Sequence, residues 1–190
     1  MVEYSHRHSF LTNIRTYKLG KKALFWQEGE GVEQYLPYGD IISVEGLFNP
    51  SRVQGNRYLL RLKTRSLGNI DITNTSYKSY GEFEEHNQTY LPFVESLHKK
   101  INEESPATRF IKGISQAGYV ASIITAILLL IVLLVAGYFF LTNGLITVVI
   151  IKTIFIIIYY PSLIRYIKSN KPGVYDPLKL PHEIFPHIEA

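Results

Sequence analysis

Basic side chains cluster in the N-terminal half of the chain. Four of them lie within one short stretch, and two more lie on a later segment; they are Arg15, Lys18, Lys21, Lys22, Arg57 and Arg61. Guanidinium and ammonium groups bind phosphate oxygens through charge-assisted hydrogen bonds, so such a cluster is able to hold anionic lipid headgroups. Glu28, Glu30 and Glu33 follow closely, and the alternative is an ordinary solvated strand face.

Lys152 is the second residue whose position suggests chemistry, because it is a lone charge in an apolar segment. Charged side chains inside membrane spans mark functional positions by default. Lys152 lies seven residues after Leu145, so it sits roughly 10 Å inside its span at about 1.5 Å per residue. The first interpretation is that the lysine snorkels to the headgroups, and the second is a contact in an assembly interface. No Asp or Glu occurs between residues 113 and 167 to form a proton or ion relay with it.

The other reactive residue types form no catalytic pattern. The chain has no cysteine, which excludes disulfides, thiolate nucleophiles and thiolate metal sites. His6 and His8 have a spacing that chelates a metal only in an ordered strand, and terminal segments are usually mobile. No nucleophile elbow, Gly-rich phosphate loop or His-Glu zinc helix occurs. We therefore expect no enzyme activity, no catalytic residue, no metal and no cofactor.

The net charge does not indicate a nucleic-acid partner. The formal charge is +4 and the pI is about 9.1, but residues 1–112 are nearly balanced, with 15 Lys and Arg against 13 Asp and Glu. The excess comes from basic residues beside the apolar segment, which is not the basic face that a nucleic-acid-binding domain presents.

Residues 113–151 contain no charged side chain. One bilayer crossing needs about 20 residues, so we expect two spans, residues 119–141 and 145–167, within a transmembrane hairpin at 118–168. Asn143 and Gly144 suit the reversal because both accept positive φ readily.

The charges around the hairpin predict its orientation. Arg109 and Lys112 precede the first span, and Arg165, Lys168 and Lys171 end or follow the second. By the positive-inside rule, both termini face the cytoplasm.

Small residues recur every four positions in the first span, at Gly118, Ser122 and Ala126. This spacing lets helices approach closely. We interpret it as a packing face for the second span, and self-association between chains is the alternative.

The segment before the hairpin predicts an α+β domain. Short alternating strands are expected at 14–19, 23–27, 32–36, 41–48, 57–64 and 70–73, separated by turn residues. Six such strands favour a small antiparallel barrel or sandwich. An amphipathic helix that begins near Thr89 carries Phe93, Val94, Leu97 and Ile101 on one face, with His98 on the other, and closes the domain.

The domain boundaries follow from these patterns. We expect a flexible N-terminus at 1–9, the domain at 10–105, a connector at 106–117 and a Pro-rich cytoplasmic tail at 169–190. Leu178, Leu180, Ile184 and Phe185 make the tail too apolar for a linker. The first interpretation is that these residues pack on the protein's own domain or lie at the headgroup level, and the second is that they form a docking peptide for a partner chain.

This order of strands and one closing helix resembles a bacterial pleckstrin-homology-like (PH-like) domain. The most specific part is the segment Pro37-Tyr38-Gly39-Asp40-Ile41 with Val44, and the final helix contributes Phe93-Val94-Glu95-Ser96-Leu97. The whole chain is similar to small bacterial proteins of unknown function that join such a domain to a helical hairpin. The resemblance implies a bacterial inner-membrane location, a habit of binding lipids or proteins, and phosphate ligands around the first hairpin.

These observations together predict a two-pass membrane protein that displays a binding or scaffolding domain to the cytoplasm. The expected partners are the lipid bilayer, anionic lipid headgroups, and a membrane-protein partner or a second copy of the chain. The alternative function is an accessory subunit of a larger membrane transporter or membrane-enzyme complex, assembled through the hairpin.

Overall fold

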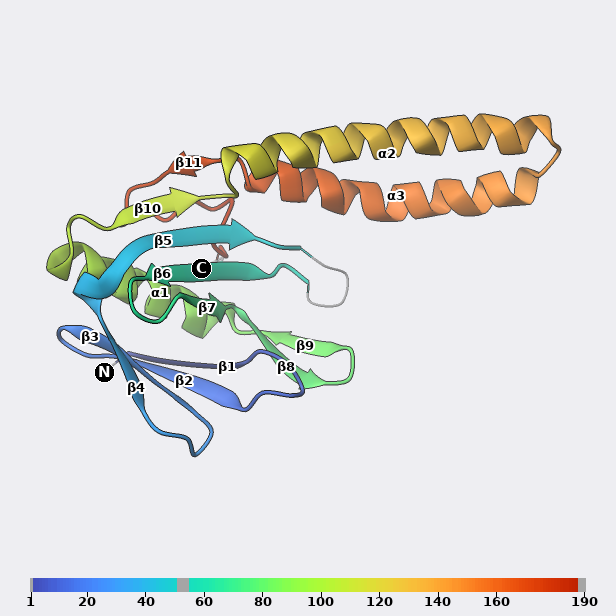
Figure 1. The fold of residues 1–190 in the computed structure, drawn as a ribbon. Coiled ribbons are helices and arrows are strands. Elements are labelled where there is room, and N and C mark those ends of the chain that lie inside the picture. Colours follow the sequence, from blue (N-terminus) through green and yellow to red (C-terminus); the bar gives the residue numbers. More distant parts are fainter. Residues whose placement is uncertain (1, 51–54, 188–190) are drawn as a thin grey trace.

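The computed structural model describes residues 2–50 and 55–187. A β-rich domain lies at one end of the molecule, and two long helices project from it as a hairpin (Figure 1). The elements before the helix α1 are β1 (Glu3–Arg7), β2 (Ile14–Leu19), β3 (Ala23–Glu28), β4 (Gln34–Pro37), the 3-10 turn η1 (Tyr38–Asp40), β5 (Ile41–Phe48), β6 (Tyr58–Thr64), β7 (Asn69–Thr73), β8 (Thr75–Ser79) and β9 (Glu82–Glu85). They are followed by α1 (Asn87–Glu104), β10 (Arg109–Lys112), α2 (Gln116–Thr142), α3 (Ile146–Ser169) and β11 (Gly173–Val174).

The strands form separate sheets and do not close into a barrel. One sheet has the order β1-β2-β3-β4, the second has the order β11-β10-β5-β6-β7, and β8 pairs with β9 as a small ribbon. The α+β class is confirmed, but the barrel form was wrong. The all-antiparallel expectation was also wrong, because β10 pairs with β5 in parallel. The helix α1 carries the chain back across the domain before β10, as a parallel connection requires.

A single apolar core lies between these sheets and α1. Alternate residues of the strands enter it, including Tyr17 and Leu19 of β2 and Leu60 and Leu62 of β6, as a period of two dictates. All six strands predicted from the sequence are present, although β4 begins two residues later than expected.

The helix α1 packs the predicted stripe into the core, and Phe93, Val94, Leu97 and Ile101 are fully buried. Two details of the prediction were wrong. The helix begins at Asn87, and Thr89 lies in its first turn, where its hydroxyl donates to the carbonyl of His86. His98 is also fully buried, although we expected it to face the solvent.

The N-terminus was expected to be flexible over residues 1–9, and the structure corrects this. Residues Glu3–Arg7 form β1, which pairs along its length with β2. Tyr4 and His6 point into the core, and the Tyr4 hydroxyl donates to the carbonyl of Thr73 at 2.5 Å. The segment is ordered by its pairing with β2 and by these two buried side chains. It is too short and polar to be recognised as a strand from the sequence.

The helices α2 and α3 are each long and apolar enough to cross a membrane. They pack along each other, and the turn between them coincides with the predicted Asn143 and Gly144. Gly144 has a positive φ of +74°. Most of their large apolar side chains are exposed, including Leu134 at 64% and Ile157 at 68%. A soluble surface of this kind would be strongly unfavourable, whereas a bilayer solvates it.

The chain after the hairpin returns to the domain that it left. The strand β11 pairs with β10, and Ile184 and Phe185 are buried in the core beside α1. A Cβ on Gly46 of β5 would collide with Ile184 and Phe185, so the tail lies directly on the sheet. The first interpretation of the tail, packing on its own domain, is confirmed for these residues. The domain is therefore built from residues on both sides of the hairpin, and the boundary at residue 105 was wrong.

The side chain of Asn170 joins the hairpin to the domain. Asn170 ends α3 and is fully buried. Its Oδ1 accepts from the backbone N–H of Phe48 at 3.0 Å, and its Nδ2 donates to the carbonyl of the same residue. The amide thus pairs with the end of β5 much as a neighbouring strand would. The carbonyl of Asn170 also accepts from the N–H of Ile114 at 3.1 Å, just before α2.

We predict that Phe185→Ala destabilises the domain by about 3–5 kcal/mol, because it empties a filled core site. The ring of Phe185 lies 5.6 Å from His98 and 5.8 Å from Tyr175, centroid to centroid. Denaturant unfolding of the detergent-solubilised protein measures this, with fluorescence of the single tryptophan, Trp26, as the signal. Leu178→Ala is the matched control, because Leu178 is 65% exposed in the same tail. Equal stability of the two variants would contradict the packing of the tail.

We predict that Asn170→Ala lowers the free energy of unfolding by about 2–5 kcal/mol, because it leaves the buried polar groups of Phe48 without partners. Asn143→Ala is the control. Both asparagines end a helix of the hairpin, but Asn143 is exposed and its side chain donates to the carbonyl of Phe139 in its own helix. The same Trp26 signal measures both variants. An equal loss of free energy of unfolding in the two would show that the hydrogen bonds between Asn170 and Phe48 do not stabilise the protein more than an exposed helix end does.

Candidate functional site

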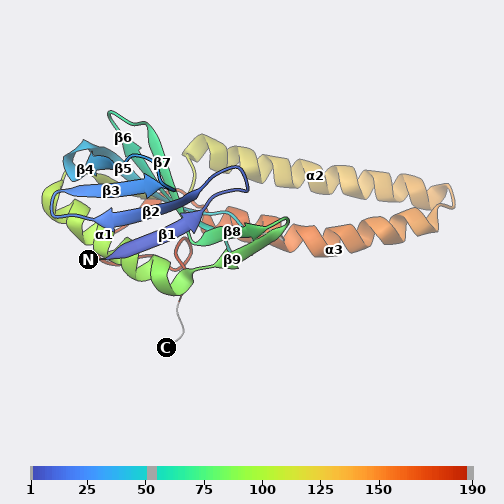
Figure 2. The same cartoon turned by 90° about the horizontal axis from the view of Figure 1, so that it is seen from below.

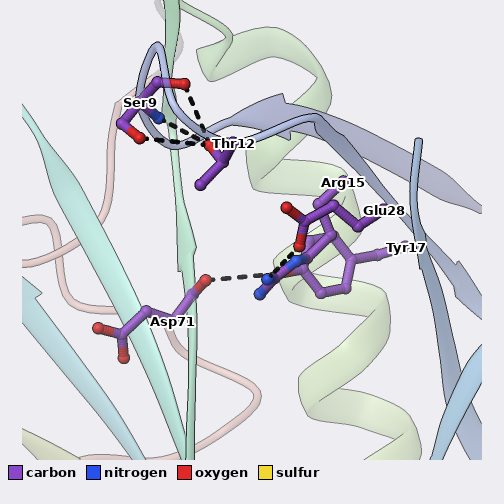
Figure 3. Close-up of polar contacts among 6 residues, drawn as sticks. All are labelled: Ser9, Thr12, Arg15, Tyr17, Glu28 and Asp71. Atoms are coloured by element: carbon purple, nitrogen blue, oxygen red, sulfur yellow. Dashed lines mark hydrogen bonds and ion pairs between the residues drawn. The ribbon is translucent and has the colours of Figure 1, made fainter. Parts of the chain in front are cut away.

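A polar pocket opens between the first sheet and β7, with a volume of about 230 Å³. Its lining mixes basic, acidic and neutral polar side chains, most of which come from β1, β2 and the turn between them. The lining residues are His6, His8, Thr12, Asn13, Arg15, Glu28, Asn69 and Asp71. Figure 3 shows Arg15, Glu28 and Asp71 at this place, with Thr12 and Ser9 in the neighbouring turn.

The register of the first sheet brings three of these side chains into one row. His6 lies opposite Arg15, and Arg15 lies opposite Glu28. The next row inward is Tyr4 and Tyr17, which are buried. Because side chains two residues apart share a face, the polar row continues the core-facing side of the sheet outward and forms one wall of the pocket.

His6 is held as a neutral ring at the inner end of the pocket. Its ring stacks on those of Tyr4 and Tyr17, at centroid distances of 5.7 Å and 5.6 Å. Burial lowers the pKa of His6 to about 3, and the nearby His8, Arg15 and Arg57 add to this effect. Its Nδ1 is buried, and it has no hydrogen-bond partner within the part of the chain that the structure describes.

Arg15 forms an ion pair with Glu28, with 2.7 Å between Nη2 and Oε2. Burial disfavours its charge, but the hydrogen bond to Glu28 raises the pKa of Arg15 above its usual value. The same bond lowers the pKa of Glu28. The two side chains are about one-third exposed, at 35% and 36%. Exposed pairs of this kind contribute only about 0–1 kcal/mol, so another anion can replace Glu28 at little cost.

Asp71 closes the opposite side of the pocket from β7. Its carboxylate accepts two hydrogen bonds from Arg61 of β6, both at 2.8 Å. Its backbone carbonyl accepts from the Tyr17 hydroxyl at 3.4 Å, which ties the two sheets together beneath the pocket (Figure 3).

The structure brings only part of the predicted basic cluster together. Arg15 lines the pocket, Arg61 reaches it through Asp71, and Arg57 is close enough to lower the pKa of His6 and His8. The other three residues lie elsewhere. Lys21 and Lys22 are exposed in the β2–β3 turn, about 20 Å from Arg15 at roughly 3.3 Å per strand residue, and Lys18 is not among the lining residues.

His6 and Asp71 belong to this site but were not predicted as members of it. The alternation of Tyr4 and His6 with polar neighbours was a signal for an inward-facing histidine, but the segment was read as a flexible terminus. Asp71 gives no local signal, because its role depends on the contact between two sheets.

Lys152 points toward α2. Its Nζ donates to the backbone carbonyl of Leu133 and lies beside Gly137. The snorkelling and assembly interpretations both stay predictions. The amine borders an apolar groove of about 530 Å³ between the helices, whose walls include Leu129, Ile151 and Phe155.

The predicted row of small residues lies on a less exposed side of α2, and its role as a packing face for α3 stays a prediction. Ala126 is the buried residue of α2, and Gly118 and Ser122 are partly buried. The Ser122 hydroxyl donates to the carbonyl of Gly118 at 2.8 Å, so its polarity is satisfied within the helix.

The polar pocket has the composition of a binding site. Its charged groups are engaged in ion pairs, and the hydrogen bond from Arg15 lowers the pKa of Glu28, which is opposite to the shift that a general acid needs at neutral pH. In residues 2–50 and 55–187, no group of three or more His, Asp or Glu residues is placed to hold a metal ion.

No protein-family model, curated protein or solved structure matches this chain. The resemblance to PH-like domains therefore rests on the sequence pattern alone.

We predict that the domain loses stability in acid through its buried histidines. Burial lowers the pKa of His6 to about 3 and that of His98 to about 4, so below pH 6.5 the unfolded chain binds protons that the folded chain excludes. The free energy of unfolding then falls by about 1.4 kcal/mol per pH unit for each histidine. His6→Phe keeps a ring between Tyr4 and Tyr17 but removes one titrating group. Between pH 6 and pH 4 it should reduce the slope of the free energy of unfolding against pH by about 1.4 kcal/mol per pH unit. An unchanged slope would contradict a neutral His6.

Proposed function

We propose that this chain is a membrane-anchored binding protein whose soluble domain takes an anionic group, such as a lipid-headgroup phosphate, in the polar pocket. The supporting observation is that Arg15 of β2 lies directly opposite the buried His6 of β1. Neutral His6 lines the pocket and has a buried Nδ1 with no hydrogen-bond partner among the described residues. Arg15 offers a guanidinium whose present partner, Glu28, is about one-third exposed. An incoming phosphate would exchange with Glu28 and accept from both side chains.

The charge balance favours an anion only once Glu28 has been displaced. The lining carries one arginine, Arg15, against Glu28 and Asp71, but Arg61 behind it pairs with Asp71, and Arg57 is close enough to lower the pKa of His6. An anion that replaces Glu28 would therefore face three arginines and one carboxylate. Burial lowers the pKa of Arg57, and the charge of Asp71 opposes this shift.

The hairpin would hold this site at a bilayer. We infer that α2 and α3 cross the membrane and that the basic residues at their domain ends keep the domain on the cytoplasmic side. Tethering raises the effective concentration of the site for other membrane components, so weak contacts suffice. The resemblance to PH-like domains supports a binding or scaffolding role over an enzymatic one, and a bacterial inner membrane as the location.

The groove beside Lys152 favours a second candidate function, an accessory subunit of a larger membrane complex. An apolar surface of this size with one amine fits a helix of another membrane protein that carries an acceptor group. In that case the hairpin would be the assembly surface, and the soluble domain would serve the complex.

We predict that the full-length protein, purified in a neutral detergent, binds glycerol 3-phosphate in a saturable and salt-sensitive manner. Arg15→Gln should weaken this binding by about tenfold or more, because charge-assisted hydrogen bonds to a phosphate contribute roughly 1.5–3 kcal/mol. Isothermal titration at low salt measures the affinity.

Lys21→Gln is the matched control, since it removes the same charge from the same hairpin but lies at the far end of β2. It should bind like the parent protein. Equal losses in the two variants would indicate a diffuse attraction to basic residues, and no saturable binding by the parent would remove the pocket from consideration.

A further inference from the structure

Two turns of the soluble domain carry exposed apolar side chains and touch each other. The β1–β2 turn holds Phe10 and Leu11, which are 63% and 80% exposed, and the β8–β9 turn holds Tyr80, which is fully exposed. Phe10 contacts the ring of Tyr77 at 6.3 Å, and Tyr77 contacts Phe83 at 5.5 Å, centroid to centroid. We call Phe10, Leu11, Tyr77, Tyr80 and Phe83 the aromatic rim.

The rim is held in place by polar contacts behind it. The guanidinium of Arg7 donates to the carbonyls of Thr12 at 2.7 Å and Phe10 at 2.8 Å, and it also lies over the ring of Tyr77. The N–H of Arg7 donates to the Ser76 hydroxyl at 3.0 Å, which joins β1 to β8. Phe10 and Leu11 therefore project from a turn whose backbone is fixed, and the same arginine joins that turn to β8.

Both turns point in the same direction as the hairpin. Figure 1 and Figure 2, which are views at right angles, agree that the β1–β2 and β8–β9 turns extend from the domain toward the side to which α2 and α3 run. The domain end of α3 lies beside the base of this ribbon, because Arg165 donates to Asn56 at 3.1 Å, and Glu85 of β9 accepts from the N–H of Asn56 at 3.1 Å.

The length of the hairpin leaves room for these turns at the membrane surface. The 27 residues of α2 extend about 40 Å at 1.5 Å per residue, whereas the hydrocarbon layer is about 30 Å thick. Because Arg165 contacts the domain, the excess length falls at the domain end of the hairpin. Glu82, Glu84 and Glu85 follow Tyr80 closely, so the ribbon fits the polar headgroup layer and not the hydrocarbon.

We propose that the aromatic rim rests in the headgroup layer of the same bilayer that the hairpin crosses, so that the domain lies against the membrane at a fixed orientation. This inference rests on the membrane-spanning hairpin of the proposed function. Aromatic side chains with polar neighbours are the residues that membrane proteins place at this depth. The occupant is the bilayer, because the two turns that carry the rim extend toward the side on which the apolar hairpin projects from the domain.

The absence of cysteine from the chain permits a direct test with single-cysteine variants. Tyr80→Cys and Leu11→Cys place an environment-sensitive fluorophore on the rim. Leu134→Cys places it on the exposed surface of the hairpin, and Leu67→Cys places it on the β6–β7 turn, at the end of β6 remote from Asn56. Each full-length variant is reconstituted into vesicles of phosphatidylcholine and phosphatidylglycerol that carry nitroxide quenchers on the headgroups or on the acyl chains.

The proposal expects headgroup nitroxides to quench the labels at 80 and 11 at least about twofold more than the label at 67, since interfacial residues lie at headgroup depth. The label at 134 should respond most to acyl-chain nitroxides. If 134 is quenched while 80 and 11 match 67, the rim proposal is overturned and the anchored hairpin stands. If 134 is not quenched by acyl-chain nitroxides, the membrane-spanning hairpin fails, and the rim proposal fails with it.

Discussion

The contact between the Asn170 amide and the backbone of Phe48 is the constraint on which the rest of the structure depends. A buried amide needs partners for its donor and acceptor, and the free end of β5 needs the same, so each satisfies the other. The Asn170 carbonyl binds Ile114, and Gly113 approaches it so closely, with φ at +74°, that a side chain would collide. The start of α2 and the end of α3 are thereby fixed to one strand, and the hairpin is attached to the domain at both of its ends.

This attachment makes the soluble domain discontinuous in sequence. Phe110 of β10 and Tyr175, just past β11, lie on opposite sides of the hairpin, yet their rings are 5.9 Å apart, and both contact His98. His98 donates through Nδ1 to the carbonyl of Val94 and accepts from the Tyr175 hydroxyl at 2.7 Å, which fixes a neutral ring in the core. The core is complete only after the chain beyond α3 has returned, so folding of the domain is coupled to formation of the hairpin. A helical hairpin that brings its two ends together lowers the entropic cost of that return.

The sequence predicted the features that arise from local periodicity. The two spans, the turn at Asn143 and Gly144, the stripe of α1 and six strands all follow from spacings of 3.6 or 2 residues. It did not predict β1, the β8–β9 ribbon, β10 or β11, because these strands are short, polar or paired with distant segments. In the candidate site, Arg15 was expected from its charge, whereas His6 and Asp71 join it only through the register of β1 with β2 and the approach of β7. Long-range pairing, which no local pattern encodes, decides which of several basic residues share a pocket.

The polar pocket and the aromatic rim share the β1–β2 turn, which would link the proposed binding site to the proposed membrane contact. Thr12 and Asn13 line the pocket, and the neighbouring Phe10 and Leu11 project from the tip of the same turn. If the tip rests among headgroups, the pocket lies within a few residues of them, and its ligands are drawn from the molecules that share that layer. A free domain would have to find such a ligand by diffusion and lose orientational freedom on binding. In the proposed arrangement the hairpin and the Asn170 side chain would already have removed that freedom, so a mixed-charge pocket with modest intrinsic affinity would be sufficient.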